Sequence, residues 1–189
     1  MDYREDINGA LKALREGGVI LYPTDTIWGL GCDATNQQAV EKIFAIKKRE
    51  ESKSLIILVN GYQMLERYVV NIPEAAASIL EVADKPITII YPLGKNLAPA
   101  VLSADGSVGI RICSDGFCNE LITRFRKPIV STSANISDAP SPRNFQEISE
   151  EILGSADYVV KHRQWETEIK TPSSVIKVDN DGVILILRK

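Results

Sequence analysis

Two segments of the sequence carry groups that could bind an anionic ligand. The first, IKKREESKSL (Ile46–Leu55), contains four cations: Lys47, Lys48, Arg49 and Lys53. An arginine offers a planar fork to phosphate oxygens, and a lysine offers a compact positive charge. In an extended segment Lys47 and Arg49 would point to the same side, so the spacing predicts a polyphosphate site. The alternative is a solvated helix end, where cations favour the C-terminal dipole.

The second segment, STSANIS (Ser131–Ser137), follows the apolar run PIV (Pro128–Val130). Its four hydroxyls and one amide come with little bulk. Small polar side chains and free backbone N–H groups together are typical of an anion or nucleotide cradle. A cluster of helix caps and turns is the alternative.

A third polar segment, YPTDTIWGLG (Tyr22–Gly31), follows a short apolar run. We interpret it as a hydroxyl-lined loop whose glycines let the backbone approach a ligand closely. The overlapping GLGCDA matches the dinucleotide fingerprint GxGxxA, but Thr24–Trp28 separates the predicted strand from the first glycine, which disfavours that interpretation. A tight turn in which Thr24 and Asp25 cap local amides is the other alternative.

Arg111 lies among apolar residues in SVGIRIC. Burying an arginine is costly unless it meets an anion, so Arg111 is a candidate ligand-binding residue. A strand-face arginine whose stem packs while its charged end reaches water is the alternative.

Composition narrows the class of protein. The chain has 189 residues and a formal net charge of −3, so any nucleic-acid affinity would have to be local. Three cysteines without a CxxC pair make a disulfide framework or a structural zinc site improbable and fit a reducing cytoplasm. No apolar run reaches the roughly 18 residues of a membrane helix. The one histidine and the lack of GxSxG disfavour a Ser-His-Asp hydrolase.

The elements that must position these groups follow from hydrophobic spacing. Helices are predicted from a cap at Asp6 or Asn8 to Gly17, after the cap Asn36, over 62–68, 73–83 and 116–126, and over FQEISEEIL (145–153). Strands are predicted over 19–22, 55–59, 87–91, 107–112 and 129–132, with a closing hairpin around DNDG. This alternation predicts an α/β domain with a twisted mixed sheet and flanking helices. The Pro- and Gly-rich segment 92–106 is a candidate lid, on composition only.

Taken together, the motifs resemble the YrdC family, the threonylcarbamoyl-AMP synthases. The resemblance covers nearly the whole chain: YPTDTIWGLGCDA, KKREESKSLIILV, SVGIRI, PIVSTSANIS and the closing TPSSVIKV with ILRK occur in the family's order. It implies one YrdC-like domain over 1–189, built on a twisted sheet with a wide concave cleft. It also implies synthesis of threonylcarbamoyl-AMP and pyrophosphate from L-threonine, bicarbonate and ATP with Mg²⁺, in the cytoplasm.

The product would pass to the transferase machinery that makes N6-threonylcarbamoyladenosine at position 37 of tRNA. Carried over residue by residue, the resemblance implies threonine contacts at Thr26, Arg111, Ser131 and Ser173. It implies ATP contacts at Lys47, Arg49, Lys53, Ser107, Ser133, Asn135, Ser141 and Arg188, with Lys47 and Arg49 catalytic.

Some positions depart from the family pattern. Glu50 and Ser54 stand where the family usually has proline and proline or glycine, and Leu58 replaces a histidine found in some relatives. Two other readings stay open. An RNA-binding module with a basic groove and no ATP chemistry is one. Weak RNA binding is also compatible with the synthase. Carbamoyl transfer in hydrogenase maturation is the other, but the acylphosphatase and zinc-finger-like regions of those proteins are not found here.

Overall fold

The computed structural model describes residues 3–49 and 55–189. Six α-helices lie in this part of the chain: α1 (Arg4–Arg15), α2 (Gln37–Lys47), α3 (Tyr62–Leu65), α4 (Glu74–Val82), α5 (Gly116–Phe125) and α6 (Glu150–Ser155). Two short 3₁₀ helices are η1 (Pro99–Val101) and η2 (Phe145–Glu147). The strands are β1 (Ile20–Tyr22), β2 (Gly29–Gly31), β3 (Ile56–Val59), β4 (Ile87–Tyr91), β5 (Val108–Ile112), β6 (Ile129–Ser133), β7 (Tyr158–Val159), β8 (Ser174–Val178) and β9 (Ile184–Arg188).

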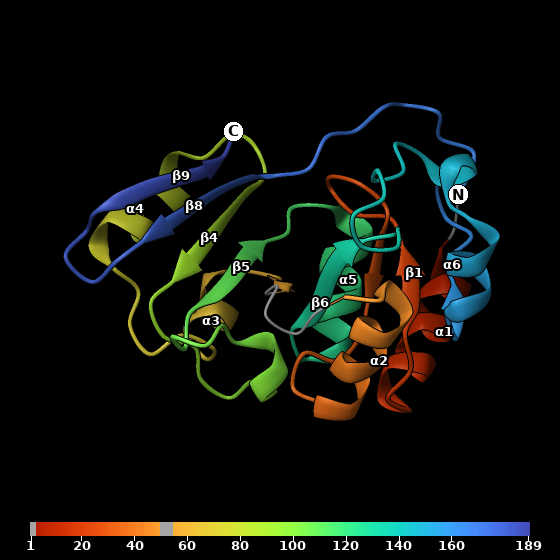
Figure 1. Cartoon of the computed structure of the whole chain (residues 1–189), viewed down its shortest axis with the longest axis horizontal. Coiled ribbons are helices and arrows are strands. Elements are labelled where there is room, and N and C mark those ends of the chain that lie inside the picture. The colour runs from red at the N-terminus through yellow and green to blue at the C-terminus, as the bar shows by residue number, and fades with distance from the viewer. Residues whose placement is uncertain (1–2, 50–54) are drawn as a thin grey trace.

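The strands form one mixed sheet in the order β7-β1-β2-β6-β3-β5-β4-β8-β9 (Figure 1). β6 joins its two halves, because it pairs antiparallel with β2 on one side and with β3 on the other. The neighbours β3 and β5 are parallel. The predicted α/β class with a mixed sheet and flanking helices is therefore confirmed.

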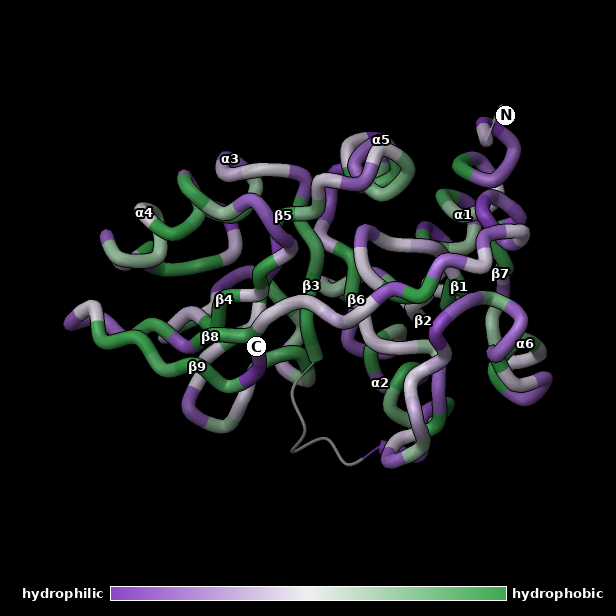
Figure 2. The backbone as a smooth tube through the Cα atoms, turned by 90° about the horizontal axis from the view of Figure 1, so that it is seen from above, coloured by the Kyte–Doolittle hydropathy of each residue, from purple (hydrophilic) through white to green (hydrophobic). Residues whose placement is uncertain are grey.

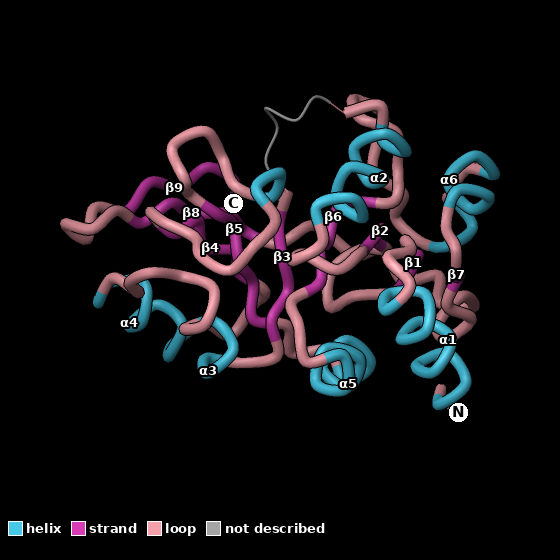
Figure 3. Tube along the Cα trace, turned by 90° about the horizontal axis from the view of Figure 1, so that it is seen from below, coloured by secondary structure: helices cyan, strands magenta, loops and turns pink. Residues whose placement is uncertain are grey.

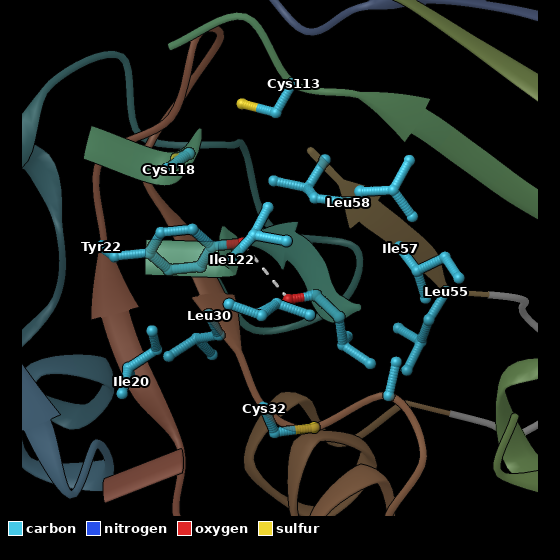
Figure 4. Packing of buried hydrophobic residues seen from close by; sticks show 14 of the residues in the cluster. Ile20, Tyr22, Leu30, Cys32, Leu55, Ile57, Leu58, Cys113, Cys118 and Ile122 are labelled. Carbon is cyan, nitrogen blue, oxygen red and sulfur yellow. Dashed lines mark hydrogen bonds between the residues drawn. The ribbon is translucent and has the colours of Figure 1, made fainter. Parts of the chain in front are cut away.

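Helices cover both faces of the sheet. α1, α3, α4 and α5 lie along one side, and α2 and α6 lie along the other (Figure 3). Buried apolar side chains fill the space between the layers, and hydrophobic residues follow β3 and β5 through the middle of the molecule (Figure 2). In the centre, the fully buried Tyr22 packs beside Leu30, and its hydroxyl donates to the carbonyl of Val130 (Figure 4).

Gly31 has a packing role. A Cβ at this position would lie 2.6 Å from the Tyr22 ring and 2.7 Å from the Val130 carbonyl oxygen, closer than real side chains come. The expectation that this glycine leaves room for a ligand is wrong, because the Tyr22 ring and β6 occupy the space. Gly29, two residues earlier, lies at the ligand-accessible end of the same strand.

The first helix begins earlier than its predicted cap. α1 starts at Arg4, so Asp6 lies inside it. The Asp6 carboxylate instead accepts hydrogen bonds from the backbone N–H groups of Lys161 and His162 and from the Tyr158 hydroxyl. A polar residue with cap propensity is here used to hold the segment after β7 against the helix.

The predicted helix 145–153 is divided. η2 ends at Glu147, Ile148 is extended, and α6 begins after Ser149, whose hydroxyl accepts from the Ile152 N–H. Ser149 is a residue type that favours a fresh N-terminus. Sequence periodicity also missed β2 and β7, which have three and two residues. Runs this short carry no measurable alternation.

Candidate active site

A pocket of about 170 Å³ is lined by residues of β2, β3, β5, β6 and β9 and of the segment just before β8. Its lining is made of hydroxyls, arginines, apolar residues and backbone: Thr26, Ile27, Trp28, Gly29, Arg49, Leu55, Ile56, Arg111, Ser131, Thr132, Ser133, Ser141, Pro172, Ser173 and Arg188. Eight of the residues predicted from the sequence are among them: Thr26, Arg49, Arg111, Ser131, Ser133, Ser141, Ser173 and Arg188. The volume is below that of pockets that enclose drug-sized ligands, so a nucleotide would extend over the rim.

The serine wall of the pocket is the end of β6. The register places Ser133 opposite Gly29 of β2 and Ser131 opposite Ile56 of β3. The strand that carries these hydroxyls is therefore flanked by a strand on each side, in the middle of the sheet. A Cβ at Gly29 would lie 3.1 Å from the Thr132 carbonyl oxygen and 3.4 Å from the Ser131 hydroxyl oxygen. Glycine therefore lets β2 approach the wall without covering it.

The threonine loop after β1 is held by its own hydroxyls. The Thr24 hydroxyl accepts from the Thr26 N–H at 3.0 Å and donates to the Ile27 carbonyl at 2.7 Å. Its proton is then in use, so the 3.0 Å contact between the two threonine oxygens is a hydrogen bond donated by Thr26. Arg111 Nη2 in turn donates to Thr26 Oγ1 at 3.3 Å. The local turn is present at Thr24, but the alternative in which Asp25 also caps an amide is wrong, because neither Asp25 oxygen accepts a hydrogen bond from a described residue. Thr26 lines the pocket.

Arg111 is buried on β5 and reaches the pocket floor. Its Nη2 lies 3.0 Å from Asp25 Oδ1, and the two side chains are 5% and 6% exposed. This ion pair has no hydrogen bond of good geometry, since neither Asp25 oxygen nor Arg111 Nε has a hydrogen-bond partner in the described part of the chain. Leu58, opposite Arg111 in the register, is fully buried. The arginine is thus poised at the pocket with hydrogen-bonding capacity unused.

Lys47 does not line the pocket as its spacing with Arg49 predicted. It is the last residue of α2, and Lys48 in a left-handed conformation ends the helix, so the two cations do not share an extended segment. The Lys47 ammonium, 1% exposed, donates to the carbonyls of Ser133 and Asn135 at 2.6 Å each. Burial, and then the charge of Arg49, lower its pKa to about 8, while the two carbonyls favour the charged form. Lys47 supports the serine wall from behind.

The three arginines that line the pocket, Arg49, Arg111 and Arg188, come from distant segments of the chain. Arg49 follows α2, and burial lowers its pKa while the charge of Asp138 acts in the other direction. Arg188 ends β9, and its Nε donates to the Ser173 carbonyl at 2.9 Å. The Ser173 hydroxyl bonds with Thr88 at 2.8 Å, which fixes the start of β8 at the pocket. Lys53 lies outside the described residues.

Two predicted nucleotide contacts lie away from the pocket lining. The buried Ser107 hydroxyl donates to Asp105 Oδ1 at 2.6 Å, and the Ser107 N–H donates to the same oxygen. These two bonds, together with Lys177, lower the pKa of Asp105 to about 2. The Asn135 amide donates to the carbonyls of Ile136 and Ala139, which shapes the turn after β6. Both side chains are used to form turns.

The candidate lid, 92–106, is tied to the body of the protein. Its backbone N–H groups at Lys95 and Ala98 donate to the carbonyls of Tyr68 and Ala34, and Val101 is fully buried. No residue of this segment is among those that line the pocket. The structure gives no support to the lid prediction.

Other lining residues were not singled out from the sequence. Trp28 is 6% exposed, and its ring lies 4.9 Å from that of Phe145, which makes it a rigid apolar wall. Trp28 lies in YPTDTIWGLG and Thr132 lies in STSANIS, two segments predicted to bind a ligand. Their place in these segments was the only sequence feature that indicated a role in the pocket. Leu55 and Pro172 also lie within quoted motifs, IKKREESKSL and TPSSVIKV, but nothing about an apolar residue or a proline there indicated a place in the pocket.

A family model described as "Telomere recombination", that of Sua5, YciO and YrdC, matches residues 12–189. The chain belongs to the Sua5/YciO/YrdC family. The resemblance inferred from the motifs is thereby confirmed. For this family member no helix in the described ranges has the length and apolar character needed to cross a membrane.

Several relatives carry a named activity. The chain is 31% identical over 172 residues to a threonylcarbamoyl-AMP synthase of Coxiella burnetii, covering 90% of this chain and 92% of the relative. It is 35% identical over 163 residues to that of Pseudoalteromonas translucida, covering 85% and 87%. A crystal structure of P. abyssi Sua5 complexed with L-threonine matches with a TM-score of 0.83 and 27% identity, covering 94% of this chain. The family member spans about half of that longer protein, 52%.

Proposed function

We propose that this chain is an L-threonylcarbamoyladenylate synthase. L-Threonine and bicarbonate give the N-carboxylate (a carbamate) and water, and a carbamate oxygen attacks the α-phosphorus of ATP with departure of pyrophosphate. The supporting observation is that arginines from three distant segments and the hydroxyls of β6 surround one pocket. Relatives that carry this enzyme's name match most of the chain.

The two substrates would divide the lining of the pocket between them, with Ser173 and Arg188 in contact where the two parts meet. Thr26, Arg111, Ser131 and Ser173 would take the threonine, with the guanidinium of Arg111 donating to its carboxylate. Arg49, Arg188, Ser133 and Ser141 would take the nucleotide and its phosphates. Negative charge grows on the phosphoryl oxygens as pyrophosphate departs, so fixed cations at this end lower the barrier.

Lys47 enters the mechanism as a positioning residue. Its ammonium fixes the carbonyls of Ser133 and Asn135, and thereby the wall that carries Ser131 and Ser133. Alignment of the carbamate oxygen, the α-phosphorus and the leaving oxygen depends on such fixed walls, because positioning supplies much of the rate in phosphoryl and adenylyl transfer. Arg49 is the catalytic cation of the two.

Mg²⁺ would enter with ATP. The residues known to line the pocket are arginines, hydroxyls and apolar groups, without a carboxylate. No cluster of three His, Cys, Asp or Glu residues occurs among the residues that the structure describes. This donor set fits a metal held by phosphate oxygens and water, where it would neutralise charge on the triphosphate.

The wider assignment is also part of the proposal. The reaction places the protein among nucleotidyltransferases, and one continuous sheet supports a single YrdC-like unit over 1–189. We propose that it works in the cytoplasm and that its product is consumed by the tRNA threonylcarbamoyl-transferase machinery. Its product, an acyl-phosphate anhydride, is an activated donor for transfer to an amine.

Product analysis tests the assignment. The protein is incubated with ATP, Mg²⁺, L-threonine and ¹³C-bicarbonate, and the mixture is analysed by mass spectrometry after rapid quenching. The expected product contains AMP, one threonine and one labelled carbon. An adenylate without the labelled carbon, or its formation without threonine, would contradict the proposal.

A further inference from the structure

Two of the three arginines that line the pocket, Arg111 and Arg188, have their charges compensated to different degrees. Arg111 has the carboxylate of Asp25 beside it at 3.0 Å, with both side chains almost completely buried. Arg188 donates to the Ser173 carbonyl but forms no ion pair with any acidic residue that the structure describes. Burial, and then the positive charge of Arg111, lower the pKa of Arg188, so the two guanidiniums lie within electrostatic reach of each other.

The Asp25 carboxylate is unusual in its surroundings. Neither of its oxygens accepts a hydrogen bond from another described residue. By contrast Asp33, equally buried, accepts from Thr35 and from Lys127. Local N–H or O–H donors therefore do not spread the negative charge of Asp25, and it acts directly on Arg111 and on a ligand placed against it.

A ligand at the Arg111 end faces an almost neutral pair of charges, whereas one at the Arg188 end faces a net cation. A phosphate group, with up to two negative charges, gains at Arg188 and is repelled by Asp25 at Arg111. A zwitterionic amino acid has no net charge and loses little from the carboxylate behind the arginine. Both ends offer hydroxyls and guanidinium N–H groups, so hydrogen-bonding capacity alone does not distinguish them.

We infer that Asp25 is a specificity-determining residue, which keeps phosphate groups out of the Arg111 end of the pocket and reserves it for a zwitterionic amino acid. The inference rests on the proposed function, in which one pocket takes both threonine and a triphosphate. Asp25 is absent from the pocket lining and acts through Arg111 and through its charge.

The test uses inorganic phosphate as the probe. Its binding is measured by isothermal titration calorimetry with and without L-threonine. In the wild-type protein, ATP displaces phosphate and L-threonine does not. Asp25→Asn, which keeps the size of the side chain and removes its charge, gains a phosphate site at least tenfold tighter at the Arg111 end, and L-threonine displaces that phosphate. Asp25→Glu restores the charge and the wild-type pattern.

Asp33→Asn is the matched control. It removes a carboxylate that is 6% exposed and paired with Lys127 at 2.6 Å, away from the pocket, so phosphate binding stays as in the wild type. Equal phosphate affinity in Asp25→Asn and the wild type overturns the inference, as does competition between L-threonine and phosphate in the wild type. The wild-type competition experiment can overturn the inference even if Asp25→Asn does not fold. Failure of L-threonine to bind the wild type would instead sink the proposed function, whatever phosphate does.

Discussion

Lys47→Met tests whether the buried lysine supports the serine wall or binds phosphate. The wild-type ammonium makes two hydrogen bonds of 2.6 Å to carbonyls, and charged hydrogen bonds contribute about 1.5–3 kcal/mol each. Burial offsets about 3 kcal/mol of this, since the pKa falls from 10.5 to about 8 and one pKa unit corresponds to ~1.4 kcal/mol. The difference leaves a net contribution of about 0–3 kcal/mol, and we expect the variant to fall in the upper part of that range, because methionine leaves both carbonyls without their donor.

For a chain of this size that loss lowers Tm by roughly 3–10 °C. Differential scanning calorimetry measures it, and the KM values for ATP and threonine are determined well below the melting range. Lys48→Met is the control, because Lys48 is 66% exposed and pairs at the surface with Glu151; such pairs contribute about 0–1 kcal/mol. If Lys47→Met melts with the control and raises only the KM for ATP, Lys47 is a phosphate ligand and the structural argument is wrong.

Three other predictions concern two pocket arginines and the lysine behind the serine wall. Arg49→Ala should lower kcat by about 10²–10³-fold, the usual loss on removing a group that stabilises transition-state charge, and unchanged steady-state kinetics would exclude Arg49 from the site. Arg111→Ala should raise the KM for threonine about tenfold or more, with a smaller effect on ATP, because a charged hydrogen bond is lost; the reverse pattern would reassign Arg111. Because the pKa of Lys47 is lowered on folding to about 8, the unfolded state binds more protons between pH 8 and 10.5. The unfolding free energy of the wild type relative to Lys47→Met should therefore rise by about 1–3 kcal/mol over that range, and urea titrations showing a constant difference would contradict it.

Much of the fold was predictable because its longer elements combine period and punctuation. α2 begins after the cap Asn36, whose side chain accepts from the Ala39 N–H, and α5 begins after Asp115 in the same way. The apolar runs that became β3, β4 and β5 were long enough to be recognised. β2 was not, because a glycine-rich strand has little hydrophobic pattern and is defined by its pairing with β1 and β6.

The candidate site was predictable where a residue's type decides its role. Arg111 in an apolar strand required an anionic partner, and the structure supplies one in Asp25, a pairing that no sequence pattern indicated. Lys47 and Arg49 have different roles because α2 ends between them, at Lys48 in a left-handed conformation. The spacing of the cations alone could not predict where the helix ends. The hydroxyls of Ser107 and Ser131 are chemically alike, and only tertiary structure sends one to a turn and the other to the pocket.

Pyrophosphate release tests the central claim most directly, namely that one pocket brings a nucleotide and an amino acid together. The wild-type protein is supplied with Mg²⁺-ATP and with L-threonine and bicarbonate singly and in combination, and release is followed by a coupled phosphate assay. We predict release only when all three substrates are present, and a loss of about 10²–10³-fold in Arg49→Ala. Release of pyrophosphate from ATP at the same rate without threonine would contradict the account.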